Sequence, residues 1–421
     1  MRIMVIGGGG REHAIVWALN NSEKVKKIYC APGNAGIAEL AECAPIPVNR
    51  FADLIQFAMD HSVDLVVVGP DDPLAEGIVD AFEEQNIPVY GPRKNAAEIE
   101  GSKIFMKNLL KKYNIPTAKY ETFTDYETAL TYLRQQEIPI VIKADGLAAG
   151  KGVTVAYSLE EAEQALSDMM VGKVFGESGG RVVIEEFLEG QEMSILAFVD
   201  GETVRAMVPA QDHKPIFDND KGPNTGGMGT YTPLPHIDPA LVEDAIENII
   251  KPTAKAMVSE GRSFRGVLFA GLMMTKNGVK TIEFNARMGD PETQVVLPRL
   301  KTDLVDIILA SINGRLDQLE LEWSEEAAVC VIAASEGYPG SYPKGRVIEG
   351  LEAAKAQGAL VFHAGTAEKD GEFVTNGGRV LGIVGRGRDI AEARARAYEA
   401  VSVIKFEGMQ YRTDIAAKAL K

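Results

Sequence analysis

The sequence predicts a multidomain protein of mixed α/β and α+β classes, with a doubly wound parallel sheet at its N-terminus. The chain has 421 residues, more than one compact core usually holds, so several domains are expected. In the first hundred residues, short apolar runs alternate with helical patterns, as they do around a parallel sheet. Longer strand-like segments then follow one another, as in an antiparallel region, and the chain ends in a mixed α/β segment.

Residues 1–101 are predicted to form the N-terminal α/β domain. The hydrophobic pattern places buried parallel strands at residues 1–6, 25–30, 65–69 and 89–90. It places the intervening helices at residues 11–19, 51–61 and 74–85. In such sheets ligands bind at the carboxyl ends of the strands. We therefore expect binding residues in the turns at 7–10, 32–36 and 69–73.

The rest of the chain is predicted to form a core domain at 102–325 and a C-terminal mixed α/β domain at 326–421. A helix is expected at 103–113, followed by a second α/β segment at about 122–188. The predicted strands of the core lie at residues 140–144, 153–156, 192–199, 203–209, 266–274 and 280–284. The C-terminal domain is expected to have strands at 327–333, 359–365 and 379–385 and a helix at 389–401.

Composition excludes several classes of function. The formal net charge of −16 argues against non-specific nucleic-acid binding, which needs a basic surface. No apolar run approaches the roughly 18 residues that a membrane-spanning helix needs, so no membrane partner is expected. Cys30, Cys43 and Cys330 are scattered without metal-type spacing. They fit a reducing compartment, and we expect the protein in the cytoplasm.

Four glycines, Gly7 to Gly10, follow the first strand and open a helix at Arg11 and Glu12. A dinucleotide fingerprint would need a third glycine where Glu12 or His13 stands, so a Rossmann cofactor site is excluded. The amides at the helix N-terminus can instead bind a phosphate on a smaller substrate. A tight turn alone explains one or two of the glycines but hardly four.

The glycine-rich segment 145–152 resembles a P-loop but lacks its last residue. Walker A requires Ser or Thr after Gly-Lys, whereas Gly152 follows Lys151. The segment also joins two predicted strands, so a lid closing over a triphosphate fits better than a P-loop. A flexible hairpin loop is the alternative. Lys143 weighs against it, because a charge at the end of an apolar run needs a partner such as phosphate.

An apolar strand at 182–186 runs into the acidic stretch that ends at Glu192. Backbone groups of such a hinge can pair with the edge of adenine, and Glu192 can accept ribose hydroxyls. A solvated acidic turn is the more common explanation of this composition.

Glu283 and Asn285 alternate on one predicted strand, so their side chains share a face. Two neighbouring oxygen ligands suit Mg²⁺, which takes the rest of its shell from phosphates. Arg287 lies on the same face if the strand continues, and can clamp a phosphate or carboxylate. A polar network satisfied within the protein is the more frequent explanation of such a pattern.

Segments 211–214 and 222–229 lie close together in the sequence. The second has three glycines around Met228, whose backbone amides suit a small carboxylate or an acyl phosphate. A plain long loop is the alternative, although structureless loops inside domains are usually functional. His213 is a conceivable base, but we favour a structural hydrogen-bonding role for it.

Together and in order, these segments resemble the glycinamide ribonucleotide synthetases (phosphoribosylamine–glycine ligases) of the ATP-grasp superfamily, over essentially the whole chain. The most specific strings are residues 8–13, 143–152, 211–214, 222–229 and 283–292. The resemblance implies the ATP-grasp fold, with a mobile lid lobe at about 122–188 in the core domain at 102–325. It also implies the ATP-dependent joining of glycine to 5-phosphoribosylamine in purine synthesis, through glycyl phosphate. It implies ATP with Mg²⁺ or Mn²⁺, and a monomer is expected.

The resemblance also implies roles for individual residues. Catalysis falls to Lys143, Arg287 and Asp212. Metal binding falls to Glu283 and Asn285. ATP is expected at Lys103, Lys143, Gly150, Lys151, Gly152, Glu185, Glu186, Leu188 and Glu192. The other substrates are expected at Gly8, Gly9, Gly10, Arg11, Lys214, Asn224, Gly226, Gly227, Met228, Arg287, Pro291 and Glu292.

Two departures from the superfamily pattern affect these expectations. The strand before Glu283 carries no acid at 268–272, so the metal shell is not fixed. Asp71 stands where the family usually has Glu, and its role stays open. Two rival functions are a bicarbonate-dependent carboxylase of a purine intermediate and a non-catalytic nucleotide sensor. Retention of Lys143, Glu283 and Asn285 argues against the sensor.

Overall fold

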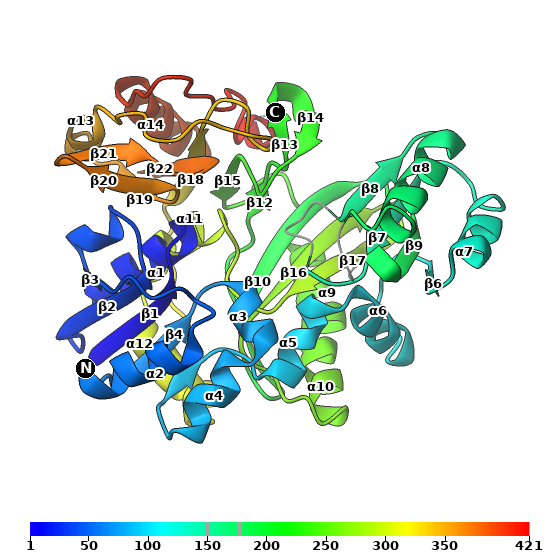
Figure 1. Ribbon diagram of the computed structural model, residues 1–421, viewed down its shortest axis with the longest axis horizontal. Coiled ribbons are helices and arrows are strands. Elements are labelled where there is room, and N and C mark those ends of the chain that lie inside the picture. The colour runs from blue at the N-terminus through cyan, green and yellow to red at the C-terminus, as the bar shows by residue number, and fades with distance from the viewer. Residues whose placement is uncertain (148–151, 175–178, 421) are drawn as a thin grey trace.

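The N-terminal region forms a parallel five-stranded sheet, as the sequence predicts. The computed structural model describes residues 1–147, 152–174 and 179–420 (Figure 1). The strand order is β3-β2-β1-β4-β5, and every pairing is parallel. The strands are β1 (Arg2–Gly7), β2 (Lys27–Pro32), β3 (Glu42–Cys43), β4 (Leu65–Val68) and β5 (Val89–Tyr90). The short edge strand β3 was not predicted.

Five helices connect and follow these strands. They are α1 (Gly10–Asn20), α2 (Phe51–Asp60), α3 (Asp71–Glu76), α4 (Ile78–Glu84) and α5 (Lys94–Gly101). The single helix predicted at 74–85 is wrong, because Gly77 between α3 and α4 has a left-handed backbone with φ 98°. Helix α5 is an addition that the sequence pattern did not indicate. Among the described residues, no helix is both long and apolar enough to cross a lipid bilayer.

The next region is a separate lobe that projects from the body of the molecule (Figure 1). Its antiparallel sheet has the order β6-β9-β7-β8, and helix α6 (Lys103–Lys112) precedes it in the chain. The lobe has its own hydrophobic core. Its elements are β6 (Tyr120–Phe123), α7 (Tyr126–Leu133), β7 (Ile140–Ala144), β8 (Val153–Ala156), α8 (Leu159–Met170) and β9 (Val182–Glu186).

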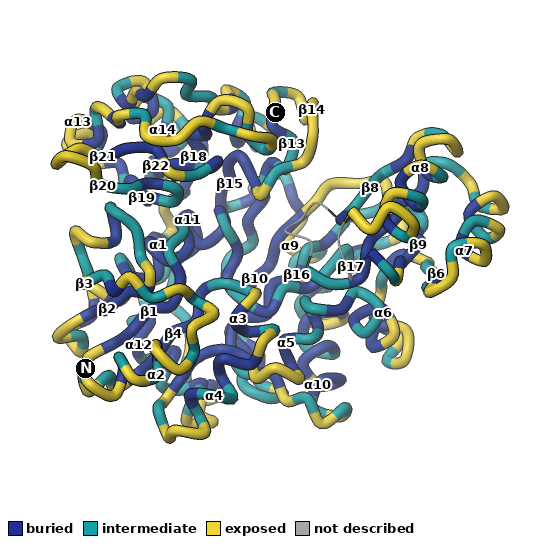
Figure 2. The backbone as a smooth tube through the Cα atoms, viewed as in Figure 1, coloured by how far each residue is buried: buried dark blue, intermediate teal, exposed yellow. Residues whose placement is uncertain are grey.

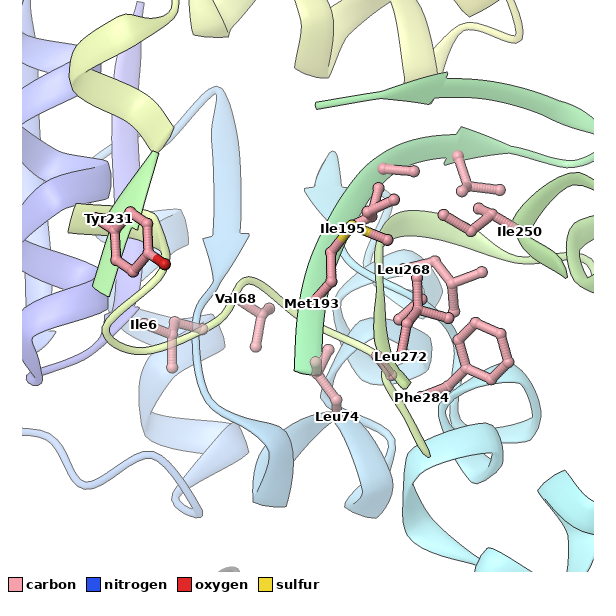
Figure 3. Packing of buried hydrophobic residues seen from close by; sticks show 14 of the residues in the cluster. Ile6, Val68, Leu74, Met193, Ile195, Tyr231, Ile250, Leu268, Leu272 and Phe284 are labelled. Carbon is pink, nitrogen blue, oxygen red and sulfur yellow. The ribbon is translucent and has the colours of Figure 1, made fainter. Parts of the chain in front are cut away.

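A long antiparallel sheet forms the centre, in the order β11-β10-β16-β17. Its strands are β10 (Gln191–Asp200), β11 (Thr203–Ala206), β16 (Arg265–Thr275) and β17 (Gly278–Asn285). Figure 3 shows how Met193, Leu268 and Phe284 of this sheet gather with Leu74 of the N-terminal domain in one hydrophobic cluster. The helices beside the central sheet are α9 (Pro239–Ala245), the π-helical turn Ile246–Ile250 and α10 (Lys251–Ser259). The N-terminal domain is thus packed firmly against the central sheet.

The C-terminal sheet has the order β12-β15-β18-β22-β19, and α14 (Ile390–Val403) packs on it. Two of its strands, β12 (Gln211–Asp212) and β15 (Gly229–Thr232), come from before residue 326, so the domain boundary there stays a prediction. The others are β18 (Ala327–Ala334), β19 (Leu360–His363) and β22 (Arg379–Gly387). The remaining elements are β13 (Pro215–Phe217), β14 (Lys221–Asn224), α11 (Thr293–Val296), α12 (Leu304–Ile312), α13 (Leu351–Ala356), β20 (Thr366–Lys369) and β21 (Glu372–Thr375).

The first and last domains meet where α1 packs against β19, in a region that Figure 2 shows as buried. The backbone amide of His363 donates to His13 Nδ1 at 2.8 Å. The side-chain amide of Asn34 donates to the carbonyls of Gly8 and His363, at 2.9 and 2.8 Å. Burial, with the nearby charge of Lys355, lowers the pKa of His13 to about 3 and that of His363 to about 4.

This interface predicts a loss of stability in mild acid. Both histidines stay neutral in the folded protein, whereas the unfolded chain takes up protons below about pH 6.5. The free energy of unfolding should therefore fall as the pH drops from about 7 to 5, by about 2 kcal/mol for His13 alone. Urea unfolding of the wild type and of His13→Asn should show a smaller acid loss in the variant. Equal losses in the two proteins would contradict the prediction.

Candidate active site

A cleft of about 480 Å³ lies where the lobe, the central sheet and both terminal domains meet. Most of the predicted site residues line it, although they are scattered over nearly 300 positions of sequence. They are Arg11, Lys103, Lys143, Gly152, Glu185, Glu186, Leu188, Glu192, Asp212, Lys214, Asn224, Gly226, Glu283, Asn285, Arg287 and Glu292. The cleft therefore unites the motifs that the sequence presents separately.

Some predicted site residues lie outside this lining. Met228 is wholly buried in the hydrophobic core, so only its backbone is available to a ligand. Gly150 and Lys151 belong to the segment 148–151, which lies outside the described residues. The others that the lining does not include are Gly8, Gly9, Gly10, Gly227 and Pro291.

Two lysines line the cleft, Lys143 from the lobe and Lys103 from the start of α6. Lys143, on β7, is 4 % exposed, and its Nζ lies 3.1 Å from Glu185 Oε1. It also donates at 3.2 Å to the carbonyl of Ile282, the residue at a bulge in the pairing of β17 with β16. The expected partner was a phosphate, and the structure supplies a carboxylate instead. Lys103 Nζ donates at 2.9 Å to the carbonyl of Gly146, in the glycine-rich segment.

The predicted adenine hinge begins at Glu185, at the end of β9. The side chain of Glu186 points to Lys280, whose Nζ lies 2.8 Å away, and also accepts from the amide of Lys119 at 3.0 Å. These contacts leave the backbone from Glu186 to Leu188 at the cleft wall. The arrangement suits recognition of a base edge by main-chain groups, with the side chains holding the hinge in place.

Glu283 and Asn285 both reach the cleft, and Gly271 opposite Glu283 on β16 adds no side chain that would cover it. Arg287 does not continue their strand, because β17 ends at Asn285. The condition under which Arg287 would share their strand face, that the strand continues, is therefore not met. Arg287 still lies beside them, since its Nη2 donates to Asn285 Oδ1 at 3.2 Å.

Glu100, at the end of α5, is a site residue that sequence reasoning missed. Its Oε1 lies 3.0 Å from Arg287 Nη2, and its Oε2 accepts from the amide of Ala286 at 2.7 Å. Burial raises the pKa of Glu100 to about 7, against the opposing charge of Arg287. A single glutamate in an unpredicted helix gave no pattern from which to find it.

The loop 222–229 is held tightly by its neighbours. Lys214 Nζ pairs with Asp212 Oδ2 at 2.8 Å, and Thr225 Oγ1 donates to the carbonyl of Lys214 at 2.7 Å. Gly227 has φ 119°, and a Cβ there would lie 2.5 Å from Asp212 and from Pro291. His213 Nδ1 lies 2.9 Å from the carbonyl of Gly229, which fits the structural role favoured for this histidine.

Glu292 closes this part of the cleft. It is almost wholly buried, and Ser194 Oγ donates to its Oε1 at 3.3 Å. Burial raises the pKa of Glu292, although Lys214 opposes the shift. Burial disfavours the charge of Lys214 too, but Asp212 and Glu292 outweigh it and raise the pKa of that lysine. The carboxyl groups of Glu292 and Asp212 therefore suit the ammonium group of a small zwitterion, and the ammonium group of Lys214 suits its carboxylate.

The glycine-rich turn before α1 is satisfied by carboxylates in the structure. The amide of Gly9 donates to Glu12 Oε2 at 2.7 Å, and that of Arg11 to Asp290 Oδ2 at 3.4 Å. The guanidinium of Arg11 bonds to Glu12 and to the carbonyl of Met288. A phosphate at these amides would have to displace Glu12 from Gly9 and Asp290 from Arg11, and the assignment of Gly8, Gly9 and Gly10 to a substrate phosphate stays a prediction.

The C-terminal domain contributes Arg379, a second residue that the sequence did not reveal. Its Nη1 donates at 2.9 Å to the carbonyls of Gly226 and Asp290. Tyr338 of the same domain accepts from the amide of Gly226 at 3.0 Å. Arg379 is the first residue of β22, and no motif surrounds it that would have marked it.

The donors at the cleft fit a divalent metal that is bound jointly with a substrate. Within the described residues, no group of three or more His, Cys, Asp or Glu side chains could hold a metal ion alone. Glu283 and Asn285 offer two hard oxygen donors beside Lys103 and Lys143, the lysines suited to phosphate. Mg²⁺ is commonly held in this way, by one or two protein oxygens and by phosphates.

Three family models match the chain in order. The N domain of phosphoribosylglycinamide synthetase matches residues 1–100, its ATP-grasp domain residues 101–293, and its C domain residues 328–418. A biotin carboxylase domain from Hydrogenobacter thermophilus is similar with a TM-score of 0.73 and 17 % identity, and covers 97 % of this chain and 91 % of its own. This likeness concerns the fold alone. The predicted fold class, with its ATP-grasp core, is confirmed.

Two similar proteins match over almost the whole length. A phosphoribosylamine–glycine ligase from Caldanaerobacter subterraneus is 54 % identical, covering 99 % of this chain and all of the relative. The crystal structure of a phosphoribosylamine–glycine ligase from Thermotoga maritima has a TM-score of 0.87 and 36 % identity, covering 99 % of this chain and all of that one. The chain therefore belongs to the phosphoribosylglycinamide synthetase family.

Proposed function

We propose that this protein joins glycine to 5-phosphoribosylamine at the expense of ATP, giving glycinamide ribonucleotide, ADP and phosphate. The proposal rests on one observation, that Lys103, Lys143, Glu283 and Asn285 line the same cleft as part of residues 222–229. We call residues 222–229 the glycine loop. One side of this cleft suits a triphosphate and the other a small amino acid. Two relatives that are covered over 97 % or more of their length are phosphoribosylamine–glycine ligases.

The chemistry requires an activated carboxyl group, because a free carboxylate is a poor electrophile. A carboxylate oxygen of glycine attacks the γ-phosphorus of ATP, and the bond from this phosphorus to the β–γ bridging oxygen breaks. ADP leaves and glycyl phosphate forms. The amine of phosphoribosylamine then attacks the acyl carbon, the carbon–oxygen bond to phosphate breaks, and the nitrogen loses a proton. Both steps are displacements, so positioning and charge neutralisation can supply most of the catalysis.

Individual residues suit these tasks. Lys143 and Lys103 bind the phosphates, and the backbone of Glu186 to Leu188 takes the adenine edge. Arg287 is within hydrogen-bonding distance of Asn285 and stabilises the negative charge that is transferred between the substrates. The backbone amides of the glycine loop hold the carboxylate of glycine, while Glu292 suits its ammonium group. The lid lobe, when closed, excludes water from the acyl phosphate.

A divalent ion completes the site in this proposal. Glu283 and Asn285 would hold it, and when bound it supplies positive charge to the triphosphate. We propose Mg²⁺ or Mn²⁺, because both accept oxygen donors. The monomeric state and the cytoplasmic location stay predictions.

The metal assignment is tested by Glu283→Gln, which keeps the shape of the side chain and removes its charge. Turnover should fall by about 10² or more, and added Mg²⁺ should restore part of it, because the weakened site then fills by mass action. The measurement is phosphate release with ATP, glycine and fresh phosphoribosylamine. Glu372→Gln, on the exposed end of β21, is the control and should behave as wild type. Full activity of Glu283→Gln at ordinary Mg²⁺ would refute the assignment.

The glycine loop is tested by Gly227→Ala. A methyl group there would collide with Asp212 and Pro291, at 2.5 Å, and would have to move the loop. The KM for glycine should rise by at least about tenfold, with the KM for ATP almost unchanged. Gly371→Ala is the matched control, because its φ of 81° is also positive and nothing lies within 4 Å of the added methyl group. Equal effects of the two variants would show general strain rather than a role in glycine binding.

The order of bond changes is tested with glycine labelled with oxygen-18 in its carboxylate. One labelled oxygen becomes the bridge of the acyl phosphate and should leave in the released phosphate, while the amide product keeps the other. A bicarbonate-dependent carboxylase would instead transfer oxygen from bicarbonate, and a nucleotide sensor would release no phosphate in response to glycine. Unlabelled phosphate formed together with glycinamide ribonucleotide would exclude the glycyl phosphate route.

A further inference from the structure

Behind Lys143 the protein buries a second lysine that the reaction as described does not use. Lys107 of α6 is wholly buried and is not among the residues that line the cleft. Its Nζ donates to Thr117 Oγ1 at 2.7 Å and lies 5.6 Å from the centre of the Tyr120 ring. A charge removed from water is costly unless it is paired, so the purpose of this lysine needs an explanation.

The partner of Lys107 is the same carboxylate that holds Lys143. Glu185 Oε2 lies 2.9 Å from Lys107, and Glu185 Oε1 lies 3.1 Å from Lys143. All three side chains are at most 4 % exposed. The carboxylate of Glu186 does not add to the balance at close range, because it is paired with Lys280 at 2.8 Å. Two ammonium groups thus share one carboxylate, which leaves one buried positive charge in excess.

An excess charge in a site of low dielectric constant is a strong attraction for an anion. If Lys107 were absent, Glu185 would neutralise Lys143, and the lysine would meet a phosphate with little net charge to offer. If Glu185 were absent, Lys143 would lose one of the two contacts that orient it and would keep only its hydrogen bond to the carbonyl of Ile282. The two groups therefore act on Lys143 in different ways, one through charge and one through position.

We propose that Glu185 and Lys107 are positioning residues for the reaction: Glu185 orients Lys143 toward the phosphates, and Lys107 keeps Glu185 from cancelling its charge. This inference rests on the proposed function, in which Lys143 binds the phosphates of ATP. It extends that function to a residue that touches no substrate.

The titration of Lys107 agrees with this arrangement. Burial lowers the pKa of Lys107 to about 8, with Glu185 opposing the shift and Lys143 adding to it. Glu186 acts on it more weakly, and the ammonium group of Lys111 lies 5.7 Å from the centre of the same Tyr120 ring. Lys107 should therefore lose its charge at the alkaline end of the range in which the enzyme can be assayed.

The test compares Lys107→Met, Lys107→Arg and the double variant Lys107→Met with Glu185→Gln. Lys107→Met should raise the KM and the calorimetric Kd for ATP by about tenfold and leave the KM for glycine unchanged. The double variant restores the excess charge and should bind ATP more tightly than Lys107→Met alone. In the wild type, kcat/KM for ATP should fall above about pH 8, and Lys107→Arg should move this fall to higher pH, because arginine stays charged.

Lys112→Met is the matched control, since Lys112 lies on the same helix and pairs with Glu260 at 2.6 Å on the exposed surface. It should leave all constants unchanged. An unchanged Kd for ATP in Lys107→Met, an equal rise in KM for every substrate, or a double variant weaker than Lys107→Met would overturn the inference. If Lys107→Met does not fold, an unshifted pH profile in Lys107→Arg would overturn it. A wild type that binds ATP without glycine-dependent phosphate release would instead refute the proposed function.

Discussion

The carboxylate of Asp290 lies where the three main parts of the chain meet, and the shape of the cleft depends on its contacts. It accepts from the amide of Arg11 at 3.4 Å and from Gln294 at 2.8 Å, and Arg379 of the C-terminal domain lies 3.4 Å away. Burial favours the neutral acid, but Arg379 and Arg11 outweigh it and lower the pKa of Asp290. The group therefore stays ionised and fixes the start of α1, the glycine loop and β22 relative to one another.

Around this point, three of the cations at the cleft are paired with a protein carboxylate, whereas Lys103 bonds to the carbonyl of Gly146. Lys143 has Glu185, Arg287 has Glu100 and Lys214 has Asp212, all at about 3 Å. Free charges would be strongly hydrated and mobile, whereas these are held in place, and Lys143 and Arg287 are also largely removed from water. When an anionic substrate binds, each of these cations exchanges contact with a protein carboxylate for contact with the substrate, and the protein reorganises little. Such preorganised charge is the usual source of electrostatic catalysis.

The sequence revealed those features that leave a local pattern. The period of the strands predicted most of the parallel sheet, and the glycine-rich turns and the alternation of Glu283 with Asn285 marked parts of the cleft. Other cleft residues, such as Lys103 and Lys214, were predicted only through the family resemblance. Glu100, Lys107 and Arg379 are single charged residues whose partners lie more than 75 positions away, so only the fold brings each pair together. The break at Gly77 was missed because the apolar spacing continues across it, while the backbone turns left-handed.

The C-terminal sheet has a consequence for the evolution of the molecule. Its strands β12 and β15 flank the glycine loop, and β15 pairs with β18 along Gly229–Thr232. The core cannot therefore be transplanted as a free-standing module, because cutting the chain near residue 325 would remove β18, one of the two strands that pair with β15, and expose a sheet edge. Recombination between homologous genes would be tolerated best when residues 211–232 and the strands after 326 come from the same parent.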